Sequence, residues 1–323
     1  MKKLSKRLAL LMALVMTMSL ALSLTACSAG SDKYVVGICQ LAPHPALDAA
    51  TQGFKDALTE KLGDQVEIKE QNAAGDTPTC ATIINGFVSD NVDLILANAT
   101  APLQAAASAT DTIPVLGTSI TEYGVALGIE NFSGTVGTNV SGTSDLAPLD
   151  QQAEMIHEWY PDAKTVGLLY CSAEDNSQYQ VDNVQAYLEN MGYTCKQYPF
   201  ADTNDMAAVT QTAADSCDVL YVPTDNTAAN NTGIIDNICR GVVPVFAGEE
   251  GICGGCGVAT LSISYYDIGY KTGEMAADIL TGKADVKTMA IEYAPQFVKK
   301  YNPAICEALG LTAPADYEAI TAE

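Results

Sequence analysis

The sequence predicts an α/β protein with two doubly wound parallel-sheet lobes and a hinged cleft between them. Apolar, strand-like runs alternate with helical patterns from about residue 34, and the alternation starts again after about residue 140. Polar segments follow several of the predicted strands. Ligands of parallel sheets bind at the carboxyl ends of the strands, so two lobes with facing strand ends would enclose a binding cleft. Two independent domains without a shared site are the alternative.

The first half of the chain alternates four predicted strands with three predicted helices. Short apolar runs rich in β-branched residues predict strands at 34–39, 66–71, 93–97 and 113–117. Helices are expected near 47–62, 77–90 and 101–110, each preceded or opened by Pro, Asp or Thr. Helices that connect parallel strands are expected to cover both faces of the sheet.

The second half repeats this pattern and then continues. Strands are expected at 165–171, 194–200, 219–222 and 243–247, and helices near 142–159, 177–191, 203–215 and 226–240. A further apolar run follows at 258–263, with a helix near 265–281 and a final helix near 302–309. The repetition predicts a second sheet of the same kind.

The N-terminal segment is typical of a bacterial lipoprotein signal. Four basic residues within 2–7 precede an apolar stretch over 8–24, which ends in Leu24-Thr25-Ala26-Cys27. Residues 1–26 are therefore expected to be removed, leaving a lipid on the thiol of Cys27 and a flexible tether over 27–33. An uncleaved transmembrane anchor is the alternative, but the apolar stretch is short for one. The protein is expected to be extracytoplasmic and lipid-anchored to the cell membrane.

Composition argues against several classes of function. Asp and Glu number 39 against 16 Lys and Arg, a net charge of -23 that disfavours nucleic acid as a partner. The sequence contains no nucleophile elbow and no Walker loop. No second Cys pair or nearby histidine completes a metal site around Cys253-Gly-Gly-Cys256, so neither a metal nor a cofactor is expected. That pair is predicted in a loop, as a local disulfide or two free thiols; thiol exchange is the enzymatic alternative.

Polar side chains after the first-lobe strands could bind an anionic group. Gln40 and His44 follow the first strand, although a lone loop histidine is more often solvated. Thr100 lies where a helix begins after the third strand, and its free backbone N–H groups with the helix dipole favour an anion. Thr118 and Ser119 add hydroxyls after the fourth strand. Capping the helix is the alternative role of Thr100.

The second lobe supplies mostly acceptors. Asn176 and Ser177 follow its first strand, Asp225 and Asn226 its third, and Glu249 its fourth. A carboxylate that faces a ligand ammonium forms a charge-assisted hydrogen bond, and we assign this role to Asp225, assisted by Glu249. Helix capping is an equally good interpretation of Asp225 alone. Donors in one lobe and carboxylates in the other suit a zwitterion, so the predicted ligand is an α-amino acid.

Four segments carry a resemblance to a known family: HPALD (44–48), YVPTDN (221–226), VPVFAGEEG (243–251) and YYDIG (265–269). They resemble the substrate-binding lipoproteins of ABC importers, and more narrowly the group whose members bind tryptophan, tyrosine or phenylalanine. The resemblance runs from about 34 to 293 and implies a type I periplasmic-binding fold with three crossovers. It implies an N-terminal lobe of 34–140 plus about 258–283, and a C-terminal lobe of 141–257 plus about 284–323. The segment 118–123 departs from the family pattern, which bears on ligand identity.

The resemblance implies a binding function and no catalysis. The expected protein is the substrate-binding subunit of an ABC importer, which captures a small amino acid and delivers it to permease and ATPase subunits. The resemblance implies that this amino acid is aromatic. The alternatives to this function are an extracytoplasmic thiol oxidoreductase using Cys253 and Cys256, and a ligand-sensing receptor of the same fold. Candidate stacking partners for an aromatic ligand are Tyr123, Tyr170, Tyr179 and Tyr265.

Overall fold

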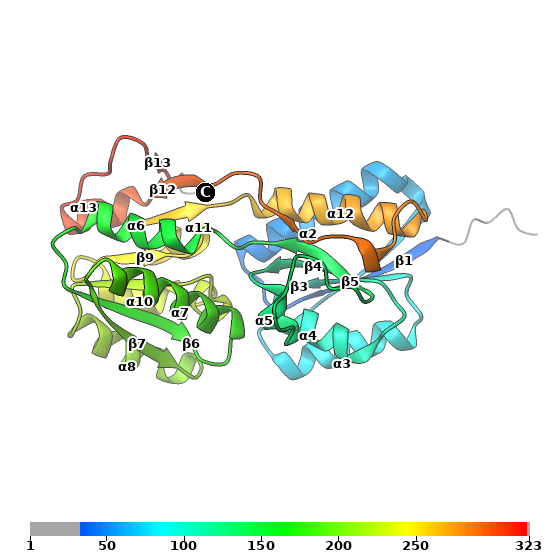
Figure 1. The fold of residues 1–323 in the computed structure, drawn as a ribbon, viewed down its shortest axis with the longest axis horizontal. Coiled ribbons are helices and arrows are strands. Elements are labelled where there is room, and N and C mark those ends of the chain that lie inside the picture. The colour runs from blue at the N-terminus through cyan, green and yellow to red at the C-terminus, as the bar shows by residue number, and fades with distance from the viewer. Residues whose placement is uncertain (1–32, 322–323) are drawn as a thin grey trace, which may run out of the picture. The chain divides into compact units, whose positions relative to one another are not determined.

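Two mainly parallel sheets, each covered by helices, make up the fold (Figure 1). The computed structural model describes residues 33–321, and from Tyr34 onward the chain forms one compact unit. The predicted signal (1–26), the lipidation site Cys27 and nearly all of the predicted tether lie outside the described residues. In the described part, no helix is long and apolar enough to cross a membrane.

The first lobe is built on a six-stranded sheet in the order β11-β5-β4-β3-β1-β2. All neighbouring strands in it are parallel. Its strands are β1 (Tyr34–Gln40), β2 (Val66–Asn72), β3 (Leu94–Asn98), β4 (Val115–Ile120), β5 (Val140–Ser144) and β11 (Glu292–Tyr293). Its helices are α2 (Pro45–Leu62), α3 (Thr77–Ser89), α4 (Thr100–Ala109), α5 (Tyr123–Leu127) and α12 (Tyr265–Leu280), with short turns η1 (Gly63–Gln65) and η2 (Val286–Thr288).

The second lobe is built on a seven-stranded sheet in the order β13-β12-β10-β9-β8-β6-β7. Only the pairing of β12 with β10 is antiparallel. The strands are β6 (Thr165–Cys171), β7 (Thr194–Phe200), β8 (Val219–Val222), β9 (Val245–Ala247), β10 (Ala259–Ser262), β12 (Val298–Tyr301) and β13 (Glu318–Ala319). The helices are α6 (Leu149–Trp159), α7 (Asp175–Asn190), α8 (Thr203–Ala214), α9 (Asn226–Ala229), α10 (Thr232–Cys239), α11 (Glu250–Cys256) and α13 (Pro303–Leu309).

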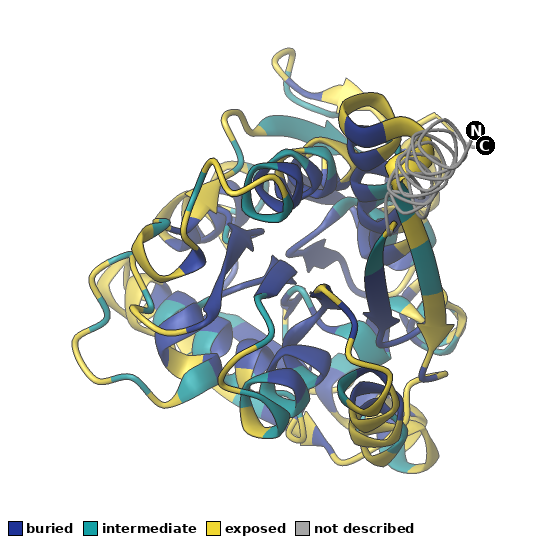
Figure 2. Cartoon of the chain, turned by 90° about the vertical axis from the view of Figure 1, so that its right-hand side faces the viewer, coloured by how far each residue is buried: buried dark blue, intermediate teal, exposed yellow. Residues whose placement is uncertain are grey.

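Side chains of the central strands alternate between two apolar layers. On β3, Leu94 and Leu96 pack with residues of α2 and α12, whereas Ile95 and Ala97 pack with residues of α3 and α4. This follows from the strand backbone, whose successive side chains point to opposite faces. Figure 2 shows the result, with buried strands inside helices whose outward faces are exposed. The predicted α/β fold with two parallel-sheet lobes is confirmed.

The boundary expected between the lobes near residue 140 is wrong. Residues 140–144 form β5, a strand of the first sheet, and the helix expected from 142 begins only at Leu149. Its sequence, Val-Ser-Gly-Thr-Ser, is polar but fully buried, so no apolar periodicity marks it as a strand. Pro148, as the N-cap residue, then sets the start of α6.

The boundaries expected at 258–283 and beyond also need correction. The run at 258–263 contains β10, which pairs with β9 in the second sheet, so it does not return to the first lobe. The helix that follows, α12, packs against α2 of the first lobe. Within 284–323, β11 pairs with β5 of the first sheet and only the part from β12 onward belongs to the second. The chain therefore passes between the lobes near 145–148, 263–264 and 294–297.

Glycines allow α2 and α12 to pack in close contact. A β-carbon on Gly269 would overlap the backbone carbonyl oxygen of Ala50, and one on Gly53 would overlap that of Tyr266. A helix interior ordinarily disfavours glycine, so these positions lose helix propensity in exchange for close backbone approach. The contact fixes α12, the helix that follows the second connection between the lobes, directly onto α2.

Gly269→Ala should destabilise the protein by about 1–3 kcal/mol, because the added methyl group has only backbone atoms to displace. The matched control is Gly86→Ala on the exposed side of α3, where nothing lies within 4 Å of an added β-carbon. That control should stabilise the protein by up to about 1 kcal/mol. Urea unfolding of both variants measures the difference; equal midpoints would contradict the close packing of α2 and α12.

Candidate ligand-binding cleft

Two adjoining cavities lie at the carboxyl ends of the strands of both sheets. The outer cleft has a volume of about 400 Å³ and is lined by the loops after β1 and β2, the start of α4, and the loops after β6, β7 and β8. The inner pocket has a volume of only about 10 Å³. It is lined by His44, Ala46, Leu47, Ser119, Thr121, Asp145, Asn176, Thr224, Asp225, Asn226, Ala229, Glu249 and Tyr265. Asn176 and Asn226 line both cavities, which makes them neighbouring compartments of one cleft.

Three buried carboxylates surround the inner pocket, and they differ in their partners. Both oxygens of Asp225 accept backbone N–H groups, from Cys171 at 2.7 Å and from Ala228 at 2.8 Å. Glu249 similarly caps the start of α11. Asp145 accepts the hydroxyl of Tyr265 at 3.0 Å through Oδ2, but its buried Oδ1 has no partner among the described residues. Asp145 therefore has an acceptor left for a ligand.

Burial raises the pKa of Asp145 to about 6 and the pKa of both Asp225 and Glu249 to about 7. Loss of hydration is the largest cause in each case. The nearby Glu174 carboxylate raises the pKa of Asp225 further. No Lys or Arg side chain from the described residues lines either compartment. A cation that entered the inner pocket would find carboxylates without a competing positive charge.

A local irregularity in β4 directs Ser119 into the inner pocket. Ser119 has a positive φ of 56°, and the register of β4 against β5 shifts between Gly117 and Ile120. Such bulges re-aim a side chain, and strained backbone of this kind gathers at functional sites. The buried Ser119 hydroxyl has no hydrogen-bond partner in the described structure. It is a second unused polar group in the same compartment as Asp145.

The start of α4 faces the outer cleft. Ala99 precedes the helix with a φ of 93° and gives it no side-chain cap, so the first backbone N–H groups of α4 remain without helical partners. Thr100 and Ala101 line the cleft beside them. The hydroxyl of Thr100 makes no hydrogen bond within the described residues. This end of α4 can therefore accept a carboxylate.

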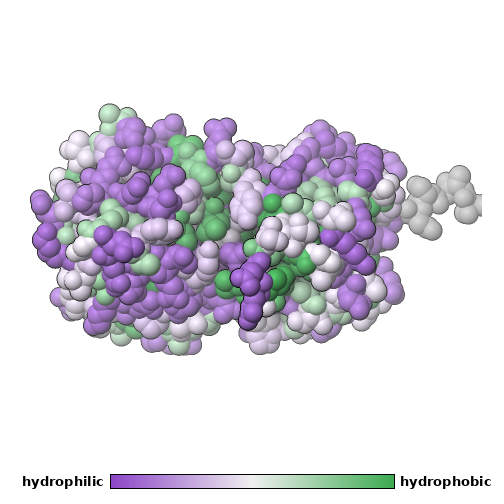
Figure 3. Space-filling model, in the orientation of Figure 1, coloured by the Kyte–Doolittle hydropathy of each residue, from purple (hydrophilic) through white to green (hydrophobic). Residues whose placement is uncertain are grey.

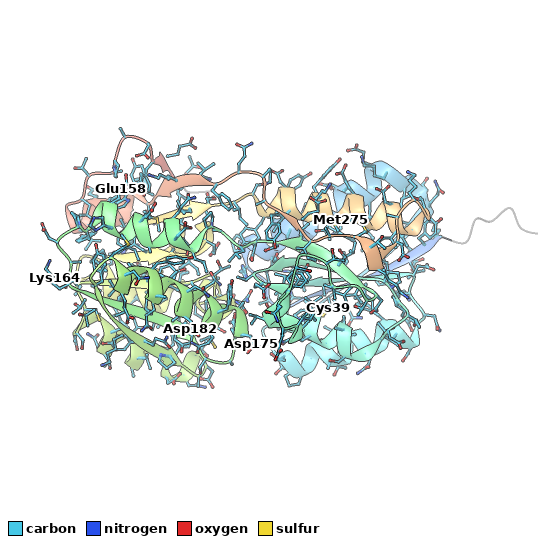
Figure 4. The ribbon with its side chains drawn as sticks, in the orientation of Figure 1. Cys39, Glu158, Lys164, Asp175, Asp182 and Met275 are labelled. Carbon is cyan, nitrogen blue, oxygen red and sulfur yellow. The ribbon has the colours of Figure 1, made fainter. Side chains whose placement is uncertain are left out.

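Two hydrogen bonds connect the lobes across the cleft. His44 Nε2 lies 3.4 Å from Asn226 Oδ1 at the inner pocket, and burial lowers the pKa of His44. Gln104 of α4 donates to Asp175 at 2.9 Å at the outer cleft. Figure 4 shows Asp175 projecting from the start of α7 toward the first lobe. Both contacts form only with the lobes close together.

Seven of the ten predicted site residues line the cleft. Thr100 lines the outer cleft, Asn176 and Asn226 line both compartments, and the remaining four line the inner pocket: His44, Ser119, Asp225 and Glu249. Asp225 and Glu249 each cap a helix, which was the alternative open for Asp225. Their capping role leaves Asp145 as the carboxylate with a free oxygen.

Three predicted site residues lie outside the lining. Gln40 bonds to Ala42, Asp48 and Thr51, and so holds the loop after β1 in place. Thr118 accepts the hydroxyl of Thr143 at 3.2 Å, on the side of the sheet that α12 covers.

Ser177 is fully buried beside Asn176 and Asp225 and supports them from behind. Gln40, Thr118 and Ser177 therefore line neither compartment.

Two further residues of the inner pocket, Asp145 and Tyr265, are absent from the polar site predicted from the sequence. Asp145 follows β5, the strand expected as part of a helix, so its position at a strand end was not recognised. Tyr265 was expected only as a stacking partner, but its hydroxyl orients Asp145. Tyr123 instead donates to two backbone carbonyls, and Tyr170 bonds to two glutamines, so neither lines the cleft.

The Cys253 and Cys256 pair lies in α11 and not in the loop expected for it. Their side chains are 0% and 2% exposed, and burial raises the pKa of both thiols far above the ordinary value. A thiol-exchange centre needs an accessible thiolate, which this environment disfavours. All nine cysteines of the described chain are free thiols. Among the described residues, no cluster of three or more His, Cys, Asp or Glu side chains could hold a metal ion.

Comparison with known proteins places the chain among binding proteins of one kind. A sequence model of the family described as "ABC transporter substrate binding protein" matches residues 35–321. A relative described as "Tyrosine-binding protein", from Clostridioides difficile, is 37% identical over 253 residues, which are 77% of this chain and 73% of that protein.

Two solved structures show the same architecture. The L-Trp complex of an ABC domain from Streptococcus pneumoniae is 32% identical and has a TM-score of 0.83, covering 88% of this chain and 96% of that one. A ligand-free, open substrate-binding protein with adhesive properties from Clostridium difficile is 36% identical with a TM-score of 0.69, covering 90% of this chain and 100% of that one. The ligand-bound relative is therefore the better structural match, although its sequence is less similar.

Because of the three carboxylates of the inner pocket, the stability of the folded protein should fall as pH rises from about 4 to about 8. The raised pKa values mean that the folded protein binds protons there more tightly than the unfolded chain, so ionisation through pH 6–7 costs stability. Asp145→Asn removes one of these charges without changing shape. Its melting temperature should match that of the wild type near pH 4.5 and exceed it near pH 8.

The control is Asp218→Asn, because backbone N–H groups of Lys164 and Thr165 hold the pKa of Asp218 below its ordinary value. The sign of the pH effect is then reversed, and this variant should lose stability relative to the wild type at pH 8. Differential scanning calorimetry of the three proteins gives the comparison. An Asp145→Asn variant less stable than the wild type at pH 8 would contradict the uncompensated burial of Asp145.

Proposed function

Because this chain belongs to the ABC transporter substrate-binding protein family, we propose that its cleft captures an aromatic amino acid and delivers it to the permease. Proteins of this family bind a solute outside the cytoplasm and are not enzymes. The proposed ligand class is supported by a relative described as tyrosine-binding and by a structural neighbour solved with L-Trp. Permease and ATPase subunits are the partners that the family implies.

The observation that carries the ligand assignment is the free, buried Oδ1 of Asp145 in a compartment the size of one water molecule. A ligand ammonium is about this size and donates the charge-assisted hydrogen bonds that the carboxylate lacks. Leaving a buried acceptor unpaired costs about 1–3 kcal/mol, so a ligand that satisfies it gains a corresponding advantage. In this proposal Ser119 and Asn176 complete the polar wall around the ammonium.

The rest of the amino acid would occupy the outer cleft. Its carboxylate would meet the open N–H groups at the start of α4 and the Thr100 hydroxyl, where the helix dipole favours an anion. The cleft volume of about 400 Å³ accommodates an aromatic side chain between Leu41 and the loops of the second lobe. Closure over the ligand would form the His44–Asn226 and Gln104–Asp175 bonds between the lobes.

Tryptophan, tyrosine or phenylalanine should raise the melting temperature in a screen of the twenty amino acids, because a ligand bound only by the folded state stabilises it. Thr100→Val should weaken the binding of that amino acid by about 1–3 kcal/mol, because its carboxylate loses a hydrogen-bond partner. The control is Thr82→Val on the exposed face of α3, where the hydroxyl bonds only to its own helix. A shift with sugars or purines, and with no amino acid, would contradict the proposed ligand class.

We also propose that the protein is a lipoprotein held to the membrane through Cys27. The signal-like segment 1–26 and the position of a cysteine directly after Thr25-Ala26 support this proposal. An anchored receptor stays within reach of its permease, which raises their effective concentration.

Cys27→Ala should move the protein from the membrane fraction to the soluble fraction of expressing cells and abolish incorporation of a labelled fatty acid. Cys195→Ala, which changes a thiol in the second sheet, is the matched control and should leave both properties unchanged. Fractionation with detection by immunoblot measures the distribution. Continued membrane association of the Cys27→Ala protein together with continued acylation would contradict the anchor.

A further inference from the structure

We propose that the inner pocket recognises the primary ammonium group as the indispensable part of the ligand, so that the protein also binds primary aromatic amines that lack a carboxylate. This inference rests on the proposed function and extends its ligand class from amino acids to arylalkylamines. A buried carboxylate oxygen of Asp145 that has no partner among the described residues lies in a compartment with room for about one water molecule.

The geometry of the inner pocket separates the ammonium from the rest of the ligand. The pocket of about 10 Å³ has room for one water-sized group, whereas the adjoining outer cleft is about forty times larger. A primary ammonium fits this space, but a group bearing two additional methyl substituents does not. The buried hydroxyl of Ser119 and the Oδ1 atom of Asp145 both lack a hydrogen-bond partner on its wall within the described residues. The pocket therefore discriminates by size as well as by charge.

The electrostatics of the cleft favour cations over anions. Asp145, Asp225 and Glu249 surround the inner pocket, and Glu174, Asp175 and Asp202 line the outer cleft. No lysine or arginine of the described chain lines either compartment. The whole chain carries a net charge of -23, and Figure 3 shows hydrophilic residues over much of the visible face. A ligand with net positive charge gains from this field, whereas a carboxylic acid without an ammonium is repelled.

The ammonium and the carboxylate of the amino acid consequently contribute unequally to its affinity. A missing ammonium leaves the buried Asp145 carboxylate without a cation, which is costly in a desolvated site. A missing carboxylate leaves only neutral N–H groups and the Thr100 hydroxyl at the start of α4, and these are open to the larger cleft, where water can satisfy them. An amine therefore retains most of the recognition, and a des-amino acid loses it.

The test is isothermal titration calorimetry on the full-length protein in mild detergent at pH 8, with four ligands: L-tyrosine, tyramine, 3-(4-hydroxyphenyl)propanoate and N,N-dimethyltyramine. The tryptophan series (L-tryptophan, tryptamine and indole-3-propanoate) is run beside it. In the series whose amino acid binds, the amine should bind with a Kd within about 100-fold of the amino acid, as expected when the hydrogen bonds lost are those at the solvent-open start of α4. The propanoate should show no heat of binding, and N,N-dimethyltyramine should bind at least about 10-fold more weakly than tyramine.

Each outcome bears on the inference. Amino acids that bind while both amines do not would overturn it and leave the proposed function intact. Amines that bind while no amino acid does would support the inference and overturn the proposed ligand. A propanoate as tight as the amine, or no binding by any of these compounds, would overturn the inference.

Two variants test whether Asp145 binds the ammonium and Thr100 the carboxylate. Asp145→Asn should weaken amino acid and amine alike by about 100-fold or more, because both need the carboxylate. Thr100→Val should weaken the amino acid but change the affinity for the amine by less than about 2-fold. Circular dichroism and the melting temperature verify that both variants fold. Unchanged amine binding by a folded Asp145→Asn protein would overturn the assignment.

Discussion

The buried carboxylate of Asp145 is the constraint on which the arrangement of the cleft depends. It lies where the chain first leaves the first lobe, directly after β5, and it accepts a hydrogen bond from Tyr265, which begins the helix after the second connection. One acidic group is therefore linked to two of the three connections between the lobes. A carboxylate so deeply buried is costly unless it is paired. A ligand that supplies the missing donor acts at the hinge itself, which is how binding can favour the closed arrangement over an open one.

The other carboxylates of the cleft cap helices or bind backbone N–H groups, and they also determine the charge of the cleft. Asp225 caps α9, Glu249 caps α11, and Glu174 accepts backbone N–H groups of Asn226 and Thr227. Capping satisfies helix N–H groups, and the positive end of each helix offsets part of the negative charge. The offset is incomplete, because the pKa values of Asp225 and Glu249 remain raised to about 7. Residues selected for folding thus create the negative field that the ligand ammonium enters.

Much of the fold followed from sequence because buried parallel strands are short apolar runs, and the resemblance added the family. What escaped prediction has identifiable physical causes. β5 is buried but polar, so periodicity gave no sign of it, and the position of Asp145 was lost with it. Thr118 and Ser119 were both expected at the ligand, but at the bulge in β4 Ser119 faces the pocket and Thr118 faces α12. A one-residue change of register reverses which face a side chain occupies, and no local composition reports it.

The size of the inner pocket is itself a consequence of helix packing some distance away. His44 is the N-cap residue of α2 and Tyr265 is the first residue of α12, so both reach the pocket from the ends of these helices. Gly269 lets the two backbones touch, and Tyr265 packs in the same apolar cluster as Ala50. A wider spacing would move the Tyr265 hydroxyl away from Asp145 and enlarge the compartment. Selection for a small cationic group therefore depends on a glycine contact that no ligand touches, because the helices that it joins set the width of the pocket.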